Sequence, residues 1–272
     1  MRAILAGKGA LPGLLLEAGP ARLVRFSGVP VDVPVGGAPV GDVPGRDVPI
    51  YDVIEARFEQ LGRLFDDLRA AGVSEVCLAG AMARPPLDPA AFDPFTAKLM
   101  PVLIQAMEQG DDALLRAVIG VIEAAGFPVV AAHLIRPDLV APEGVLAGAI
   151  TGQADAARAR AVLDALGPLD VGQGAVVANG QVIGVETLQG TDAMLGFVAR
   201  TAPGSGGVFV KRPKVGQDLR VDMPAIGPET IRNAAAAGLA GIEIAAGNVL
   251  LLDRDAILAA CAHTGMSLWA RP

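Results

Sequence analysis

Apolar and polar residues alternate along the first half of the chain in a pattern that predicts strands followed by helices. Short apolar runs, typical of buried strands, lie at 2–7, 23–26, 75–80 and 128–135. Apolar residues recur every three to four positions, as on one face of a helix, over 11–19, 54–68 and 111–126. Strands alternating with helices indicate an α/β domain with a parallel, doubly wound sheet.

Two details refine this pattern. The helix over 54–68 has the clearest period, and Gly72 supplies its C-terminal stop. The segment 28–49 is rich in Gly, Pro and Val, so we expect a long connection with little regular structure.

The second half of the chain is built differently. The alternation breaks at 136–144, where two prolines fall, and we place a domain boundary there, giving domains 1–135 and 136–272. Asn179-Gly180 between two apolar runs predicts a β-hairpin, because both central residues of its turn need positive φ. Further helices and strands are expected at 154–166, from Thr191, at 207–211, from Pro228, as an antiparallel pair over 241–253, and up to Gly265. This order predicts an α+β domain with a mixed or antiparallel sheet.

Composition narrows the class of protein. The 272 residues are 52% apolar, yet no uninterrupted apolar run reaches the ~18 residues of a spanning helix. A net charge of −7 argues against nucleic acid as a partner, since phosphate backbones favour broad basic surfaces. Cys77 and Cys261 lie in apolar surroundings, as expected of buried thiols in a reducing cytoplasm. The apolar excess leaves room for a greasy ligand or a subunit interface, so a homodimer stays open.

The segment 211–230 is a positive island in this acidic chain. Between 211 and 222 it holds four basic residues, Lys211, Arg212, Lys214 and Arg220, against two acids, Asp218 and Asp222. Lys and Arg bind phosphate oxygens, and interleaved aspartates can hold a hard cation on them. A helix start at Pro228 adds an anion-binding terminus. The island favours a phosphorylated small molecule with magnesium; the alternative is a solvated, mixed-charge loop.

Two other acidic groups have both a functional and a structural interpretation. Glu186 and Asp192 flank a glycine turn and could bind a cation, whereas Thr191 between them could simply cap a helix. Asp111 and Asp112 open a helix, which either one could cap; alternatively Asp112 faces a ligand, with Arg116 one turn on.

Two familiar site types are not supported by the sequence. Gly7-Lys8-Gly9 lacks the third glycine of a dinucleotide fingerprint, so a tight turn at the ligand end of a parallel sheet is favoured, and we count Gly9 among the substrate-binding candidates. His133 and His263 stand alone in apolar contexts, which predicts buried histidines with satisfied hydrogen bonds rather than a zinc site or a catalytic triad.

Four strings resemble one known family. They are GDDALLR (110–116), VETLQGTDAML (185–195), KRPKVGQDLRVDMPAIGPET (211–230) and AAGNVLLLD (245–253), and they are similar to the UDP-2,3-diacylglucosamine pyrophosphatases of the LpxI type. The resemblance implies a Rossmann-like N-terminal domain, a C-terminal domain of its own, and a substrate held between them. It also implies magnesium-dependent hydrolysis of UDP-2,3-diacylglucosamine to UMP and 2,3-diacylglucosamine 1-phosphate (lipid X), a step of lipid A biosynthesis in Gram-negative bacteria.

The resemblance also suggests roles for individual residues. Asp222 is the expected catalytic and metal-binding residue, and Asp192, Glu186, Gln217 and Asp218 match other motif positions of the family. Among the candidates, we expect Asp192 and Gln217 to be catalytic and Glu186 to bind the metal. The expected substrate-binding residues are Gly9, Asp112, Thr191, Lys211, Lys214, Asp218 and Arg220. Cleaving a pyrophosphate needs charge neutralisation on its oxygens and a positioned water, which Mg²⁺, the basic residues and one carboxylate would supply. The calcineurin-like metal motifs are absent from the sequence, which excludes a dinuclear site of that design.

Two alternatives remain. One is an oxidoreductase that binds a nucleotide sugar or dinucleotide on the N-terminal sheet, and the other is a non-catalytic sensor of a phosphorylated ligand. In each case we expect a cytoplasmic protein. Contact with the inner membrane would be peripheral at most, because the sequence contains no basic amphipathic helix.

Overall fold

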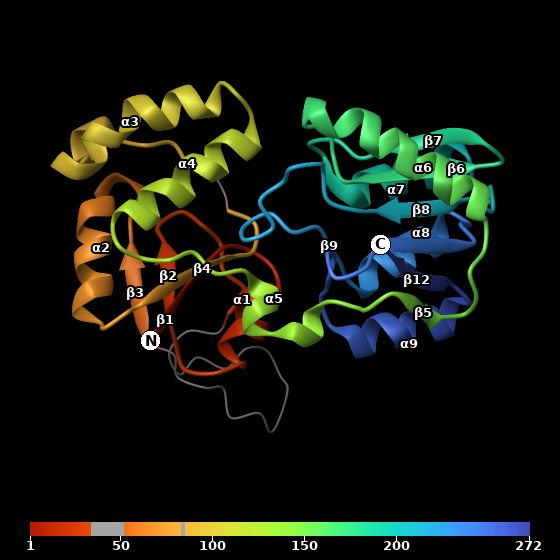
Figure 1. Cartoon of the computed structure of the whole chain (residues 1–272), viewed down its shortest axis with the longest axis horizontal. Helices are drawn as coiled ribbons and strands as arrows, with labels where there is room; N and C mark the ends of the chain where they lie inside the picture. The colour runs from red at the N-terminus through yellow and green to blue at the C-terminus, as the bar shows by residue number, and fades with distance from the viewer. Residues whose placement is uncertain (34–51, 83–84) are drawn as a thin grey trace. The chain divides into compact units, whose positions relative to one another are not determined.

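The computed structural model describes residues 1–33, 52–82 and 85–272 (Figure 1). The chain divides into two compact units, Met1–Arg136 and Pro137–Pro272. Most of the connection expected at 28–49 lies outside the described residues, because the description stops at residue 33 and resumes at 52.

The first unit is built on a parallel sheet. Its described strands run in the order β3-β2-β1-β4, with β1 Arg2–Ala6, β2 Ala21–Phe26, β3 Val53–Ala56 and β4 Glu75–Ala79. In the register, Ile4 of β1 lies between Leu23 of β2 and Cys77 of β4, and all three side chains are fully buried. This order matches the first four strands of the doubly wound arrangement.

Helices pack around this sheet. They are α1 Leu11–Leu16, α2 Leu61–Ala70, α3 Pro94–Met107, α4 Asp111–Ala124 and α5 Ala132–Ile135. The amphipathic helix α2 buries Leu64, Phe65 and Leu68. Asp93 caps α3 by accepting a 2.7 Å hydrogen bond from the Thr96 N–H, and α3 lies beside α4 (Figure 1).

Two predictions for this unit are wrong in part. The helix expected from residue 54 begins only at Leu61, because Ile54 pairs with Val24 as part of strand β3. Residues 128–135 were expected to form a strand, but only Val129 bridges to Val76, and Ala132–Ile135 is helical. In both places the apolar spacing does not by itself decide between helix and strand, because the pairing of a strand depends on residues that are distant in the sequence.

The second unit contains a mixed sheet, as predicted. The order of its described strands is β5-β12-β10-β8-β6-β7, with β5 Gly144–Ala147, β6 Gly174–Ala178, β7 Gln181–Val185, β8 Val208–Lys211, β10 Gly241–Ala245 and β12 Ser267–Arg271. The inner strands β8, β10 and β12 are parallel, whereas β5, β6 and β7 pair antiparallel with their neighbours.

The antiparallel pair predicted over 241–253 is wrong. Strand β10 pairs in parallel with β8 and β12, while β11 (Leu250–Leu251) pairs in parallel with β9 (Ala225–Ile226) in a separate two-stranded sheet. The turn between the two apolar runs therefore does not form a hairpin.

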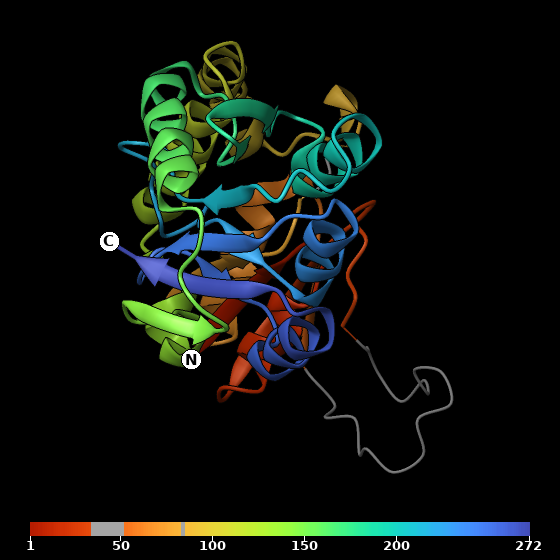
Figure 2. The same ribbon diagram turned by 90° about the vertical axis from the view of Figure 1, so that its right-hand side faces the viewer.

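Helices cover both faces of the mixed sheet. They are α6 Gln153–Leu166, α7 Gly190–Thr201, α8 Pro228–Ala236 and α9 Arg254–Thr264. Ala175 and Val210 pack under α6 with Trp269, whereas Val176 and Phe209 pack under the other three helices. This alternation follows the period of two along a strand, and Figure 2 shows α6 (green) across the strands from α7, α8 and α9.

The predicted hairpin turn is present and is tied to a helix. Asn179 and Gly180 have φ of 50° and 75°. Asp155, in the first turn of α6, accepts hydrogen bonds from both of their backbone N–H groups, at 3.0 and 2.7 Å. One carboxylate therefore joins the β6–β7 turn to the helix that covers the sheet.

We expect Asp155→Ala to lower the free energy of unfolding of the second unit by about 1–2 kcal/mol, because two backbone donors lose a charged acceptor. Trp269 is the single tryptophan of the sequence and is buried in this unit, so its fluorescence during urea unfolding reports the change. Asp255→Ala is the matched control, since Asp255 is an exposed acid in the first turn of α9. Equal losses in the two variants would contradict the role of the turn.

Candidate functional site

The antiparallel pairing of β6 with both neighbours gathers three chain segments at one edge of the mixed sheet. Gly174, the first residue of β6, pairs with Lys211, the last residue of β8, and Ala175 pairs with Val185, the last residue of β7. Residues 172–174, Glu186 and the loop that leaves β8 therefore lie next to one another.

A buried ion pair lies at this edge. The Lys211 Nζ donates to Glu186 Oε1 at 2.9 Å, to Glu186 Oε2 at 2.7 Å and to Thr191 Oγ1 at 2.8 Å. Lys211 is only 3% exposed and Glu186 8%. These contacts occupy the three ammonium protons and both carboxylate oxygens. Lys211 as a phosphate ligand and Glu186 as a metal ligand stay predictions.

Glycines lie directly over this pair. A Cβ on Gly174 would be 2.5 Å from Glu186 Oε2 and 2.8 Å from the Phe209 ring. A Cβ on Gly172 would be 2.0 Å from the Glu186 carbonyl oxygen, and its φ is +57°. Only glycine lets the chain approach Glu186 this closely, so residues 172–174 run directly against the backbone and the carboxylate of Glu186.

Asp222 lies in a cluster of amides. The Gln217 side-chain NH₂ donates to the Asp222 backbone carbonyl at 2.6 Å and to its Oδ2, and the Gln173 NH₂ donates to the same Oδ2 at 3.4 Å. Burial raises the pKa of the Asp222 carboxyl above its usual value, against the opposing effects of the Lys214 charge and the two amide hydrogen bonds.

The remaining candidates of the second unit are paired within the chain. Lys214 forms an ion pair with Asp170, and Arg220 forms one with Asp218 at 2.7 Å. The Asp218 carboxylate also accepts the Arg220 N–H at 3.0 Å, which closes the turn before Asp222. Asp192, in the first turn of α7, accepts a 3.0 Å hydrogen bond from the Asn233 amide of α8.

Gly9 and Asp112 belong to the first unit. The Gly9 N–H donates to Asp32 at 2.8 Å. Gly110 is the N-cap of α4, and Asp112 in its first turn pairs with Arg116 at 2.7 Å. The expected cap, Asp111 or Asp112, therefore lies inside the helix. The same holds for Thr191, which lies inside α7, whereas Gln189 is the N-cap of that helix. Their substrate-binding roles stay predictions.

The prediction of two buried, satisfied histidines is wrong. His263 is exposed on α9. His133 is half-buried, and its Nδ1 is a buried atom without a hydrogen-bond partner among the described residues. Burial lowers the pKa of His133. An apolar sequence context alone does not decide burial, because each side chain lies on one face of its helix.

The described residues contain no group of three or more His, Cys, Asp or Glu side chains arranged to hold a metal ion. The Asp222 Oδ1, however, has no hydrogen-bond partner within the described parts of the chain, whereas its Oδ2 has two. One open carboxylate oxygen suits Mg²⁺ when phosphate oxygens and waters complete the shell, which is how proteins commonly bind this ion.

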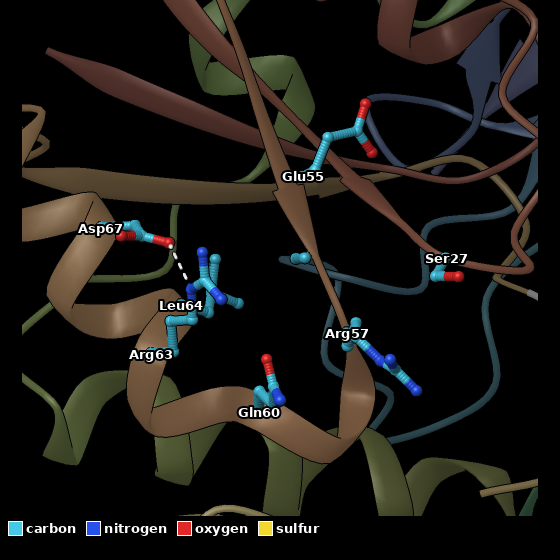
Figure 3. A pocket seen from close by; sticks show the side chains of 8 residues that line it. Ser27, Glu55, Arg57, Gln60, Arg63, Leu64 and Asp67 are labelled. Carbon is cyan, nitrogen blue, oxygen red and sulfur yellow. Dashed lines mark ion pairs between the residues drawn. The ribbon is translucent and has the colours of Figure 1, made fainter. Parts of the chain in front are cut away.

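A pocket of about 350 Å³ lies in the first unit (Figure 3). It is lined by Ser27, Glu55, Ala56, Arg57, Gln60, Arg63, Leu64 and Asp67. Arg63 and Asp67 form a 3.7 Å ion pair across one turn of α2. The predicted site residues are not among those lining the pocket, whose charged side chains come from strand β3, the residue after it and helix α2.

Sequence reasoning missed Gln173 and Asp170, the partners of Asp222 and Lys214. Both come from the segment before β6 and precede their partners in the sequence by 49 and 44 positions. The available signal was Gly172-Gln173-Gly174, a polar residue between two glycines at the start of an apolar strand. Such a pattern indicates close backbone approach, but it does not name the partner.

Comparison with known proteins defines the class. The sequence model of the LpxI N-terminal domain matches residues 1–139, and that of the LpxI C-terminal domain matches residues 142–269. The chain therefore belongs to the LpxI family. A relative from Caulobacter vibrioides (strain ATCC 19089 / CIP 103742 / CB 15) is 42% identical over 217 residues, which is 76% of this chain and 78% of the relative. That protein is named UDP-2,3-diacylglucosamine pyrophosphatase LpxI. Among the described residues, no helix is long and apolar enough to cross a membrane.

We expect Lys211→Ala to destabilise the second unit by about 3–5 kcal/mol, because it leaves the Glu186 carboxylate buried without its cation. The double variant Lys211→Met with Glu186→Leu should lose clearly less free energy of unfolding than the sum of the losses in Lys211→Met and Glu186→Leu alone. Urea unfolding of each variant, followed by Trp269 fluorescence, measures these losses. Strictly additive losses would show that the pair is not coupled.

The raised pKa of Asp222 has a consequence for stability. As pH rises above 3.8, the ordinary value, the unfolded chain loses this proton before the folded chain does. The parent should therefore lose stability relative to Asp222→Asn between pH 4 and 7, when both are unfolded with urea in EDTA. Parallel curves for the parent and Asp222→Asn would contradict the shift.

Proposed function

We propose that this protein hydrolyses the pyrophosphate of UDP-2,3-diacylglucosamine, with Mg²⁺, to UMP and 2,3-diacylglucosamine 1-phosphate. The observation that carries the proposal is the match of both units to the LpxI family together with the relative named for this substrate. The structure supports it through Asp222, whose carboxylate is held at one oxygen and open at the other.

The reaction joins a water oxygen to one phosphorus and breaks a bridging P–O bond. Bound Mg²⁺ would neutralise the phosphate oxygens and lower the barrier to attack. Asp222 would hold the ion through Oδ1, or take a proton from the water there. Its Oδ2 would keep the hydrogen bonds from the two amides. Oδ1 could therefore act without first breaking a contact within the protein.

Basic residues of the island would bind the phosphates. Lys214 and Arg220 are half-buried and each already contacts an aspartate, Asp170 and Asp218. Such pairs hold long side chains in place, and Lys and Arg side chains make strong hydrogen bonds to phosphate oxygens. In this proposal Lys211 acts differently: it supports the site by fixing Glu186, because its three donors are used inside the protein.

The substrate of this proposal carries two acyl chains, so it lies at a bilayer surface. We therefore propose that the protein works in the cytoplasm in peripheral contact with the inner membrane. Helix α3 offers apolar surface, since Phe95, Val102, Ile104 and Met107 are 38–56% exposed.

The proposal is tested by incubating the purified protein with UDP-2,3-diacylglucosamine and measuring UMP. We expect release with Mg²⁺ and loss of release in EDTA. Asp222→Ala should lower kcat by about 100-fold or more, because the group that meets the developing charge is removed. Asp255→Ala, an exposed acid on α9, should retain the parent rate.

The alternatives give different results. If the parent releases no UMP with Mg²⁺, the hydrolase proposal fails, and tight NADH binding would then favour an oxidoreductase. Binding of the UDP-sugar without turnover would indicate a sensor. If Asp222→Ala turns over as fast as the parent, the role of Asp222 is wrong while the reaction stands.

A further inference from the structure

The carboxylate of Asp222 is bound unequally at its two oxygens. Gln217 and Gln173 both donate to Oδ2, and Oδ1 has no hydrogen-bond partner among the described residues. A carboxylate torsion is broad and nearly two-fold, so without such contacts the two oxygens would exchange places readily. The two amides together therefore select which oxygen is presented.

Gln217 is held by backbone groups at both ends of its amide. Its Oε1 accepts the Lys214 N–H at 2.9 Å, and its NH₂ donates to the Asp222 backbone carbonyl at 2.6 Å. These contacts determine the orientation of the amide, because only the NH₂ end can meet an acceptor. Gln217 thus belongs to the same loop as Asp222 and moves with it.

Gln173 is held by a different part of the chain. Its backbone carbonyl accepts the Arg212 N–H at 2.9 Å, which continues the β6–β8 pairing by one step. On either side, Gly172 and Gly174 lie against Glu186, whose carboxylate is bound by Lys211. The position of Gln173 is therefore set by the edge of the sheet and by Glu186 of the buried ion pair, and not by the turn between Lys214 and Asp222.

We propose that Gln173 is a positioning residue for Asp222. It joins the loop of Asp222 to the sheet edge and, with Gln217, holds Oδ2 so that Oδ1 faces the cation or the water. The inference rests on the proposed function and deepens it. Gln217 alone ties Asp222 to its own loop, whereas Gln173 is the contact that fixes the carboxylate relative to the sheet.

The test uses the whole protein and three variants. Gln173→Ala removes the amide, and Gln173→Asn keeps it but withdraws it by one methylene, beyond reach of Oδ2. Gln181→Ala is the matched control, an exposed glutamine at the start of β7. UMP release gives kcat and KM, and Mn²⁺ binding without substrate, followed by electron paramagnetic resonance, gives a readout that does not depend on turnover.

We expect both Gln173 variants to lower kcat by about 10–100-fold with KM changed less than threefold, and to weaken Mn²⁺ binding by a similar factor, since partners that orient a metal ligand have effects of this size. The Gln181 variant should match the parent. Folded Gln173→Ala protein with parental kcat and parental Mn²⁺ affinity would overturn the inference.

The two proposals fail separately. If the parent releases no UMP, the proposed reaction is wrong, and the Mn²⁺ arm still decides on Gln173 by comparing the parent, Gln173→Ala and Asp222→Ala. A rise in KM as large as the fall in kcat, with unchanged Mn²⁺ affinity, would mean that Gln173 contacts the substrate instead of orienting Asp222. That result would also overturn the inference.

Discussion

The ion pair between Lys211 and Glu186 is the interaction on which the C-terminal site depends. Burying two charges is costly, and the cost is recovered only when the geometry is good and every donor and acceptor is used. Here each ammonium proton has an acceptor, with Thr191 taking the third. The antiparallel register brings the ends of β7 and β8 to the start of β6, so the sheet itself supplies that geometry.

Glu186 of this pair also contacts the backbone of the segment before β6. Residues 172–174 lie so close to Glu186 that two of them must be glycine, and the third, Gln173, projects its amide to Asp222. The other charged candidates of the island are paired with each other or with their neighbours. Asp222 differs from these residues in that burial raises its pKa, which is typical of, though not confined to, residues in functional sites.

Local signals predicted the local parts of this structure. The Asn179-Gly180 turn needs only its own two residues, and the strand at 2–7 and the helix from residue 111 follow from their own apolar patterns. The strand at Ile54 and the parallel pairing of β10 could not be derived in this way, because each depends on strands far away in the sequence. The class of each domain was predictable, whereas the register within it was not.

The candidate site, too, could be predicted from the sequence only in part. The island at 211–230 stands out by charge, and the family resemblance names Asp222 and Gln217 within it as candidates. The internal pairing of Lys211 with Glu186 was not foreseen, because both residue types also suit phosphate and metal binding. Gln173 carries no charge and comes from another strand, so only the folded sheet reveals it as a partner.

The most direct test is a crystal structure of the protein with Mn²⁺ and UMP, in which anomalous scattering locates the ion. We expect the ion at about 2.1 Å from the Asp222 Oδ1, with Gln173 and Gln217 still donating to Oδ2 and Lys211 still bound to Glu186. An ion bound to Glu186 in place of Lys211, or an Asp222 carboxylate released from both amides, would contradict it.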